Sequence, residues 1–184
     1  MSSTLGVCVR KIGVFIMLIG VLAACSNTNW REASREPAGL AVNPAITKDA
    51  VIEFYAADAF SWRGWFAVHT WIAVKPENAT EYTVYEVVGW RVKQGLPALK
   101  QYQTTTPDRY WYGAKPDKVL SIQGDKAKQL IPEVTAAINR YPWANEYTLF
   151  PGPNSNTFPQ WVGLQVPELE LELPFRAIGS GYAD

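Results

Sequence analysis

The chain has 184 residues, of which 48% are apolar and 18% are charged, so its composition is that of a chain with a packed core rather than a disordered one. The 17 basic and 17 acidic residues cancel, which removes the electrostatic attraction that nucleic-acid binding requires. One His and two Cys exclude a zinc finger and a His-rich metal cluster, and the 13 Gly form no phosphate-binding loop. We therefore predict neither a metal nor a cofactor, and no nucleic-acid partner.

Residues 1–24 have the pattern of a cleaved signal peptide. Arg10 and Lys11 precede an apolar run from Ile12 to Leu22, and the segment contains no acidic residue. The run is shorter than the ~20 residues that a membrane-spanning helix needs. It ends in Leu22-Ala23-Ala24-Cys25, with small residues before the expected cleavage site.

The sequence Leu-Ala-Ala-Cys resembles a bacterial lipobox. The resemblance implies cleavage before Cys25 and attachment of lipid to its sulfur, and Ser26 after the Cys favours the outer membrane with the domain in the periplasm. An ordinary secretion signal with an incidental Cys is the alternative. Residues 25–45, with their Ser, Asn, Pro and Gly, are predicted to be a lipidated tether, and residues 46–184 a single domain.

Four segments of the domain are rich in β-branched and aromatic residues and are predicted as strands: Ala50–Ala57, Trp65–Val74, Tyr82–Val92 and a short one at Val119–Gln123. The second and third are expected to pair as an antiparallel hairpin. Residues 94–117, which contain Tyr110-Trp111-Tyr112, receive no assignment.

Leu130, Val134 and Ile138 recur every four residues, which predicts a helix that opens at Gly124-Asp125 with Asp125 as its cap. Pro132 either kinks this helix or begins a second one.

A short helix is expected from Thr157 to Gln165, and the alternating Glu168–Glu172 is expected to be an edge strand. The predicted fold class is therefore α+β, an antiparallel sheet with two or three packed helices.

His69 is the only His of the chain and lies in the second predicted strand. By alternation it shares a face with Trp71 and Ala73. An imidazole at this place can act as a general base, or it can be a buried neutral side chain in an aromatic core.

A polar turn follows Pro151-Gly152-Pro153. Its residues Asn154, Ser155, Asn156 and Thr157 are all good helix N-caps. Free N–H groups at a helix start can hold an oxyanion, and a Ser there becomes nucleophilic when a base adjoins it. The alternative is a capped turn whose side chains only satisfy backbone groups.

Three blocks resemble a bacterial lipoprotein family known as domain-of-unknown-function family 3750: Ala67–Ala73, Tyr85–Trp90 and Gly152–Phe158. Ile131-Pro132, Tyr141-Pro142, Pro167–Leu169 and Leu173 to Gly179 fit the same pattern. The resemblance runs from about Val51 to the C-terminus and implies no activity.

A more distant likeness is to circularly permuted papain-like hydrolases of the lecithin–retinol acyltransferase type. That likeness implies a strand His at His69, an orienting residue at Glu86, and the nucleophile within Asn154-Ser155. Ser155 stands where that group has Cys, which leaves open a serine enzyme, a silenced enzyme that binds, and a mistaken analogy.

Two functions are therefore predicted. In the first, an amide or ester hydrolase, Ser155 attacks a carbonyl, His69 accepts the proton, Glu86 orients His69, and N–H groups around Asn156 and Thr157 hold the negative charge. In the second, a non-catalytic lipoprotein binds peptidoglycan, lipid or an envelope protein. Its groove would include Trp71, Trp90 and Trp111. A third interpretation is that the polar turn with Asn154 has a structural role only and stabilises the fold.

Overall fold

A computed structural model describes residues 29–184, so the predicted signal peptide and Cys25 lie outside the described residues. The chain divides into two units, one up to Ala33 and one from Ser34 to Asp184. In the first, the described residues form a short turn in which the N–H groups of Glu32 and Ala33 donate to the carbonyl of Asn29. Among residues 29–184, no helix has both the length and the apolar character needed to cross a bilayer.

The second unit is built on a five-stranded antiparallel sheet with the order β4-β3-β2-β1-β5. The fold is therefore α+β, as predicted. The strands are β1 (Val51–Asp58), β2 (Val68–Lys75), β3 (Tyr82–Val87), β4 (Leu99–Thr104) and β5 (Asp117–Gln123). The predicted hairpin is present, because β2 pairs with β3.

Two predicted strands are shorter than expected because the chain turns at one end of the sheet. Before β2, residues Ser61–Trp65 form the 3-10 helix η1. After β3, residues Gly89–Val92 form the single-turn helix α2. The ring of Tyr147 lies where a Cβ at position 89 would be, so only a Gly allows the turn to pack there.

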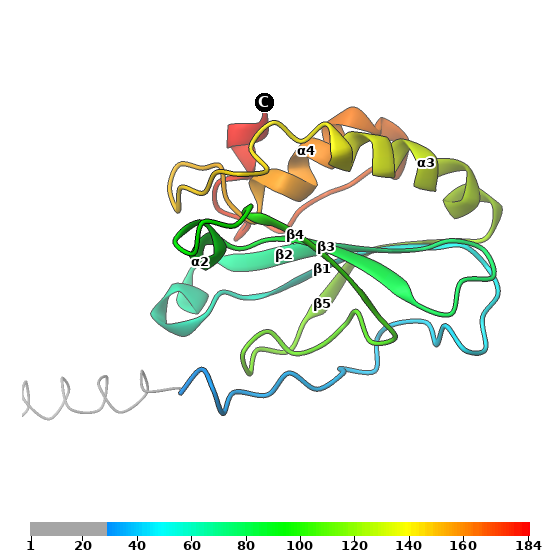
Figure 1. Ribbon diagram of the computed structural model, residues 1–184, viewed down its shortest axis with the longest axis horizontal. Coiled ribbons are helices and arrows are strands. Elements are labelled where there is room, and N and C mark those ends of the chain that lie inside the picture. Colours follow the sequence, from blue (N-terminus) through cyan, green and yellow to red (C-terminus); the bar gives the residue numbers. More distant parts are fainter. Residues whose placement is uncertain (1–28) are drawn as a thin grey trace, which may run out of the picture. The chain divides into compact units, whose positions relative to one another are not determined.

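Two longer helices cover one face of the sheet (Figure 1). They are α3 (Asp125–Asn139) and α4 (Thr157–Gln165). Pro132 lies inside the continuous helix α3 and so does not begin a second helix. The prediction of Asp125 as the cap is wrong, because Gly124 occupies the N-cap and no side chain bonds there, so the helix begins at Asp125 itself.

The residues after α4 contain the 3-10 helices η2 (Pro167–Leu169) and η3 (Ser180–Ala183). The edge strand predicted at Glu168–Glu172 is not formed. Glu170 has a left-handed φ of 51°, which a strand does not allow. Of the alternating Glu and Leu residues, Leu169 is buried in the core, and this burial explains the apolar position in the pattern.

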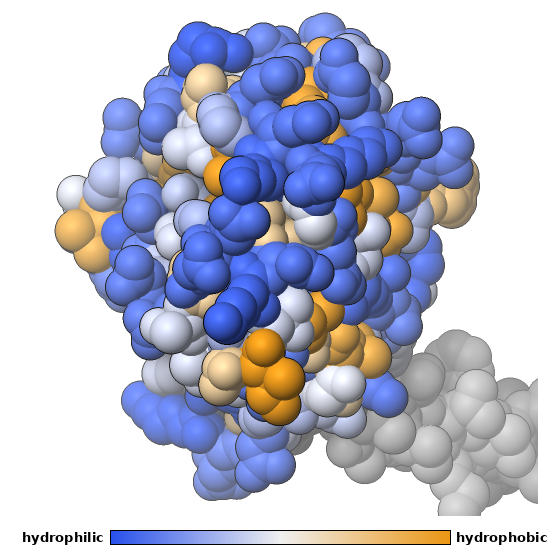
Figure 2. Space-filling model, turned by 90° about the vertical axis from the view of Figure 1, so that its right-hand side faces the viewer, coloured by the Kyte–Doolittle hydropathy of each residue, from blue (hydrophilic) through white to orange (hydrophobic). Residues whose placement is uncertain are grey.

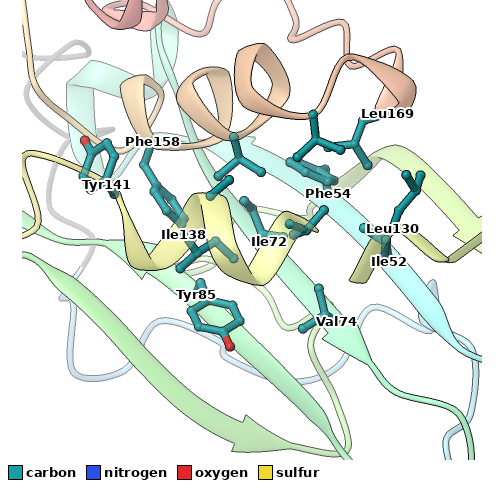
Figure 3. Close-up of a cluster of buried hydrophobic side chains, with 14 of the residues drawn as sticks. Ile52, Phe54, Ile72, Val74, Tyr85, Leu130, Ile138, Tyr141, Phe158 and Leu169 are labelled. Atoms are coloured by element: carbon teal, nitrogen blue, oxygen red, sulfur yellow. The ribbon is translucent and has the colours of Figure 1, made fainter. Parts of the chain in front are cut away.

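The main core fills the space between the sheet and the two helices (Figure 3). Alternate residues of each strand point into it, because side chains of a strand alternate between faces. The labelled core residues include Phe54 from β1, Ile72 from β2, Ile138 from α3 and Phe158 from α4. Apolar burial of this kind stabilises the fold by roughly 25 cal/mol for each Å² removed from water.

Within residues 29–184, the opposite face of the sheet carries no helix and is covered by irregular segments. Residues 105–116 cross it, and residues 34–42 pack along them. Asp108, which is buried, accepts hydrogen bonds from the N–H groups of Leu40 (2.5 Å) and Ala41 (3.1 Å). Tyr110 N–H donates to the carbonyl of Glu36. The compact unit therefore includes residues 34–45, which were predicted to be part of the tether.

Candidate ligand-binding cleft

His69 and Glu86 lie on the helix-free face of the sheet. His69 is opposite Ala57 in the β1–β2 register, and Glu86 is opposite Trp71 in the β2–β3 register. The neighbouring core on this face includes Ala57, Trp71 and Trp111, so both polar side chains are surrounded by aromatic and apolar residues. Their exposed fractions are 5% for His69 and 3% for Glu86.

His69 and Glu86 interact directly. Nε2 of His69 lies 3.4 Å from Oε2 of Glu86, and because a carboxylate accepts, the imidazole carries its proton on Nε2. The ring stacks on Trp111 with a centroid separation of 3.6 Å and an interplanar angle of 10°. The structure therefore brings together His69 and Glu86, the pair that the distant papain-like likeness implied, while the orienting role of Glu86 stays a prediction.

Two cations approach the second oxygen of Glu86. Nζ of Lys100 lies 3.3 Å and Nη2 of Arg109 lies 3.5 Å from Oε1. Lys100 is placed by the β3–β4 register, in which it is directly opposite Glu86. Arg109 also donates to the hydroxyl of Tyr102 at 2.8 Å. Both cations remain about one-third exposed, so each can also reach a ligand.

The pKa values of the pair follow from burial and charge. Burial lowers the pKa of His69 below 6.5, against the opposing hydrogen bond and charge of Glu86. Burial alone would raise the pKa of Glu86, but the hydrogen bond from His69 and the charges of Lys100 and Arg109 bring it below 4.5. Near neutral pH the site therefore holds a neutral imidazole and an ionised carboxylate.

We expect the single imidazole to titrate below pH 6.5, its ordinary value, when its ring proton signals are followed by NMR. The unfolded chain takes up this proton at a higher pH than the folded chain. The stabilisation is therefore complete above pH 6.5 and is lost as pH falls through the folded pKa. A His69→Gln variant should lack this part of the pH dependence of unfolding. An imidazole midpoint above 6.5 would contradict the described burial.

A small cleft of about 40 Å³ opens over Glu86, so a ligand larger than a few atoms would lie mainly across its mouth. Three cationic and four aromatic side chains line it together with Glu86: Arg35, Lys100, Arg109, Trp90, Tyr110, Trp111 and Tyr112. The guanidinium of Arg35 lies 4.3 Å from the centre of the Tyr112 ring, and Trp90 meets Tyr112 edge to face. The walls thus combine aromatic rings with positive charge.

The three Trp residues predicted to line a groove have different places. Trp90 and Trp111 line the cleft and stack on each other at 5.8 Å, and Trp90 is 44% exposed. Trp71 is not among the lining residues. It is buried and donates its indole N–H to the carbonyl of Pro107, so it supports the floor of this region.

The polar turn lies on the other face of the sheet, beneath the helices. Thr70, which alternates with His69 in β2, donates to Oδ1 of Asn156 (3.0 Å) or to the carbonyl of Ser155 (2.8 Å). Nδ2 of Asn156 donates to the carbonyl of Val68. His69 and Ser155 therefore lie on opposite faces of β2, and the predicted proton transfer between them has no path in this arrangement.

The N–H groups proposed for an oxyanion are already used. Those of Asn156 and Thr157 donate to Oδ1 of Asn154 at 2.9 and 3.3 Å. Asn154 Nδ2 donates to the carbonyls of Leu149 and Ile178, and Thr157 Oγ1 donates to the carbonyl of Gly179. The turn thus joins α4 to the C-terminal segment, which agrees with the structural reading of these residues.

Sequence reasoning missed Arg35, Lys100 and Arg109. Lys100 could have been found from its position opposite Glu86, but only if the polar stretch Leu99–Thr104 had been predicted as strand β4. The aromatic triplet at 110–112 marked the wall of the cleft but not its partner strands.

Among residues 29–184 there is no group of three or more His, Cys, Asp or Glu side chains placed to hold a metal ion. A family model described as protein of unknown function, DUF3750, matches residues 49–182. No curated protein and no solved structure matches the chain.

Proposed function

Because this chain belongs to the DUF3750 family of proteins of unknown function, we propose a function from its cleft: non-catalytic binding of an anionic ligand that carries a flat ring. The observation that carries the proposal is the gathering of three cations and four aromatic rings around one buried carboxylate. The proposal corresponds to the second of the two functions expected from the sequence.

Charge supports an anionic ligand. Lys100 and Arg109 both approach Glu86, so two cations meet one carboxylate at the cleft. Glu86 holds Lys100 and Arg109 in place from below, while the exposed parts of both side chains face the opening. Cations positioned in this way bind a carboxylate or phosphate without the cost of ordering the side chains anew.

The aromatic walls support a ligand with a ring. The half-exposed face of Trp90 is backed by Trp111, which in turn stacks on His69. A rigid aromatic face of this kind packs against the apolar face of a sugar or another flat group at little entropic cost. The stack accounts for the burial of His69 without a catalytic role. The imidazole ring supports the Trp111 wall of the cleft, and its N–H donates to Glu86.

The predicted lipid on Cys25 and the predicted outer-membrane location, with the domain facing the periplasm, narrow the ligand class. In that compartment, cell-wall glycopeptides combine sugar rings with peptide carboxylates. We propose that such a muramyl glycopeptide is the ligand. Its carboxylates would pair with Lys100 and Arg109, and a sugar ring would pack on Trp90.

We do not extend the proposal to hydrolysis by Ser155. The likeness to permuted papain-like hydrolases predicts a base beside position 155, and the geometry of the turn does not favour this. Two features favour instead the third alternative left by the sequence, a mistaken analogy: His69 contacts Glu86 on one face of the sheet whereas position 155 lies on the other, and the nearby N–H groups are bonded to Asn154.

Calorimetric titration of the protein with soluble muramyl dipeptide tests the proposal. We expect saturable binding that weakens as salt is added, because ion pairs with exposed cations are screened. Neutral chitobiose, which offers sugar rings without a carboxylate, is the matched control and should bind more weakly. Equal affinity for both ligands, or no binding of either, would refute the proposed ligand class.

A further inference from the structure

Exposed apolar residues gather at one end of the sheet. Antiparallel pairing places the end of β1, the start of β2 and the end of β3 at this end, with η1 and α2 as the connections (Figure 1). We call this surface the apolar end. Its members are the exposed residues Trp62, Trp65, Phe66, Val92, Leu96, Leu149, Phe150, Phe175 and Ile178.

Hydrogen bonds join three of the contributing segments, and the Tyr147 ring packs against Gly89 at the start of α2. The guanidinium of Arg176 donates to the carbonyl of Gly64 in η1, and the carbonyl of Arg176 accepts from Val68 at the start of β2. Asn154 joins the carbonyls of Leu149 and Ile178. The loop around 150, the segment around 176, η1 and α2 therefore form one end of the domain rather than scattered sites.

The exposure at this end is unusually high for large apolar side chains. Phe175 is 98% exposed, Phe150 73% and Trp65 69%. Several such residues at one end of a domain mark a surface that another apolar phase can cover. The opposite end, at the turn of residues 76–81, is mainly hydrophilic (Figure 2), and all but Ala79 of its residues are exposed. Apolar exposure is thus concentrated at one end.

The chain enters the domain at the apolar end. The carbonyl of Ser34, the first residue of the compact unit, accepts from Gly113 N–H. The ring of the adjacent Tyr112 lies 5.3 Å from that of Phe60, which immediately precedes η1. Cys25 lies nine residues before Ser34, so the connecting chain spans at most about 30 Å.

We infer that the apolar end lies against a lipid bilayer. The inference rests on the proposed lipid on Cys25, which would keep the entry point of the domain within ~30 Å of the membrane. Trp and Phe side chains are favoured at the boundary between acyl chains and headgroups, and cations among them meet anionic headgroups. Arg63 beside Trp62 and the exposed Lys93 of the turn after α2 supply such cations.

An environment-sensitive fluorophore tests the contact. The full chain, matured in a bacterial host, is labelled on Phe175→Cys or on Trp65→Cys and reconstituted in vesicles of phosphatidylethanolamine and phosphatidylglycerol. Ile46→Cys is the matched control, because Ile46 is 78% exposed and lies near Lys48, which bonds to the turn at Asn78 at the opposite end. These side chains are exposed, so the substitutions leave the core intact.

We expect the emission of probes at 175 and 65 to move to shorter wavelength and to be quenched by brominated lipid, with no change at 46. Protein that floats with the vesicles but shows water-like emission at both test sites would overturn the inference. Protein that does not float with the vesicles would also overturn the inference, because it would show that the proposed lipid on Cys25 does not hold the domain at the membrane. Titration of the Phe175→Cys variant with muramyl dipeptide reports separately on the cleft, so the two proposals fail independently.

Discussion

Replacing Asn154 with alanine is expected to lower the free energy of unfolding by about 3 kcal/mol, because buried backbone groups lose their partners. Oδ1 of Asn154 accepts from two N–H groups at the start of α4, and Nδ2 donates to the carbonyls of Leu149 and Ile178. Alanine fills none of these roles, and the packing of the side chain against Gly179 leaves little room for water to replace it. Urea denaturation followed by circular dichroism measures the change.

Ser155→Ala is the matched control for this prediction. The residue is equally buried, but its described hydrogen bond is made by its backbone carbonyl, which the substitution retains. We expect a change within about 0.5 kcal/mol, typical of a substitution that removes no partner. If Ser155→Ala were as destabilising as Asn154→Ala, the assignment of the turn's stability to Asn154 would be wrong.

The double substitution Lys100→Gln with Arg109→Gln is expected to reduce the affinity for muramyl dipeptide at least ~10-fold, since hydrogen bonds to charged groups contribute about 1.5–3 kcal/mol each. The variant should also show less dependence of affinity on salt. Calorimetric titration measures both effects.

Lys126→Gln is the control for that variant, because Lys126 is exposed on α3, on the other side of the sheet. It should leave the affinity unchanged. A similar loss in both variants would indicate a diffuse electrostatic effect and would contradict a bound position at Glu86.

The strands and helices that were predicted well are those with a strong local pattern. The apolar β1 and β2 and the four-residue recurrence in α3 report burial directly. The polar strand β4 was missed because its residues are only partly buried, and its pairing is fixed by β3 and not by its own pattern. Residues 34–45 looked like a tether because their hydrogen bonds are to the distant Asp108, which no local pattern reveals.

The candidate site divides in the same way. Strand alternation correctly placed His69 on the face of Trp71, and Glu86, chosen from the distant papain-like likeness, does lie beside His69. Alternation could not tell which face the helix start at Ser155 would meet. Thr70, the neighbour of His69, takes that contact, so a shift of one position along β2 separates the two halves of the predicted catalytic pair.

A crystal structure of the protein with muramyl dipeptide tests the central claim most directly. The account predicts a ligand carboxylate within hydrogen-bond distance of the Arg109 guanidinium or the Lys100 ammonium, with a ring against Trp90. A ligand bound instead at the turn around Ser155, with the cleft over Glu86 empty, would contradict it.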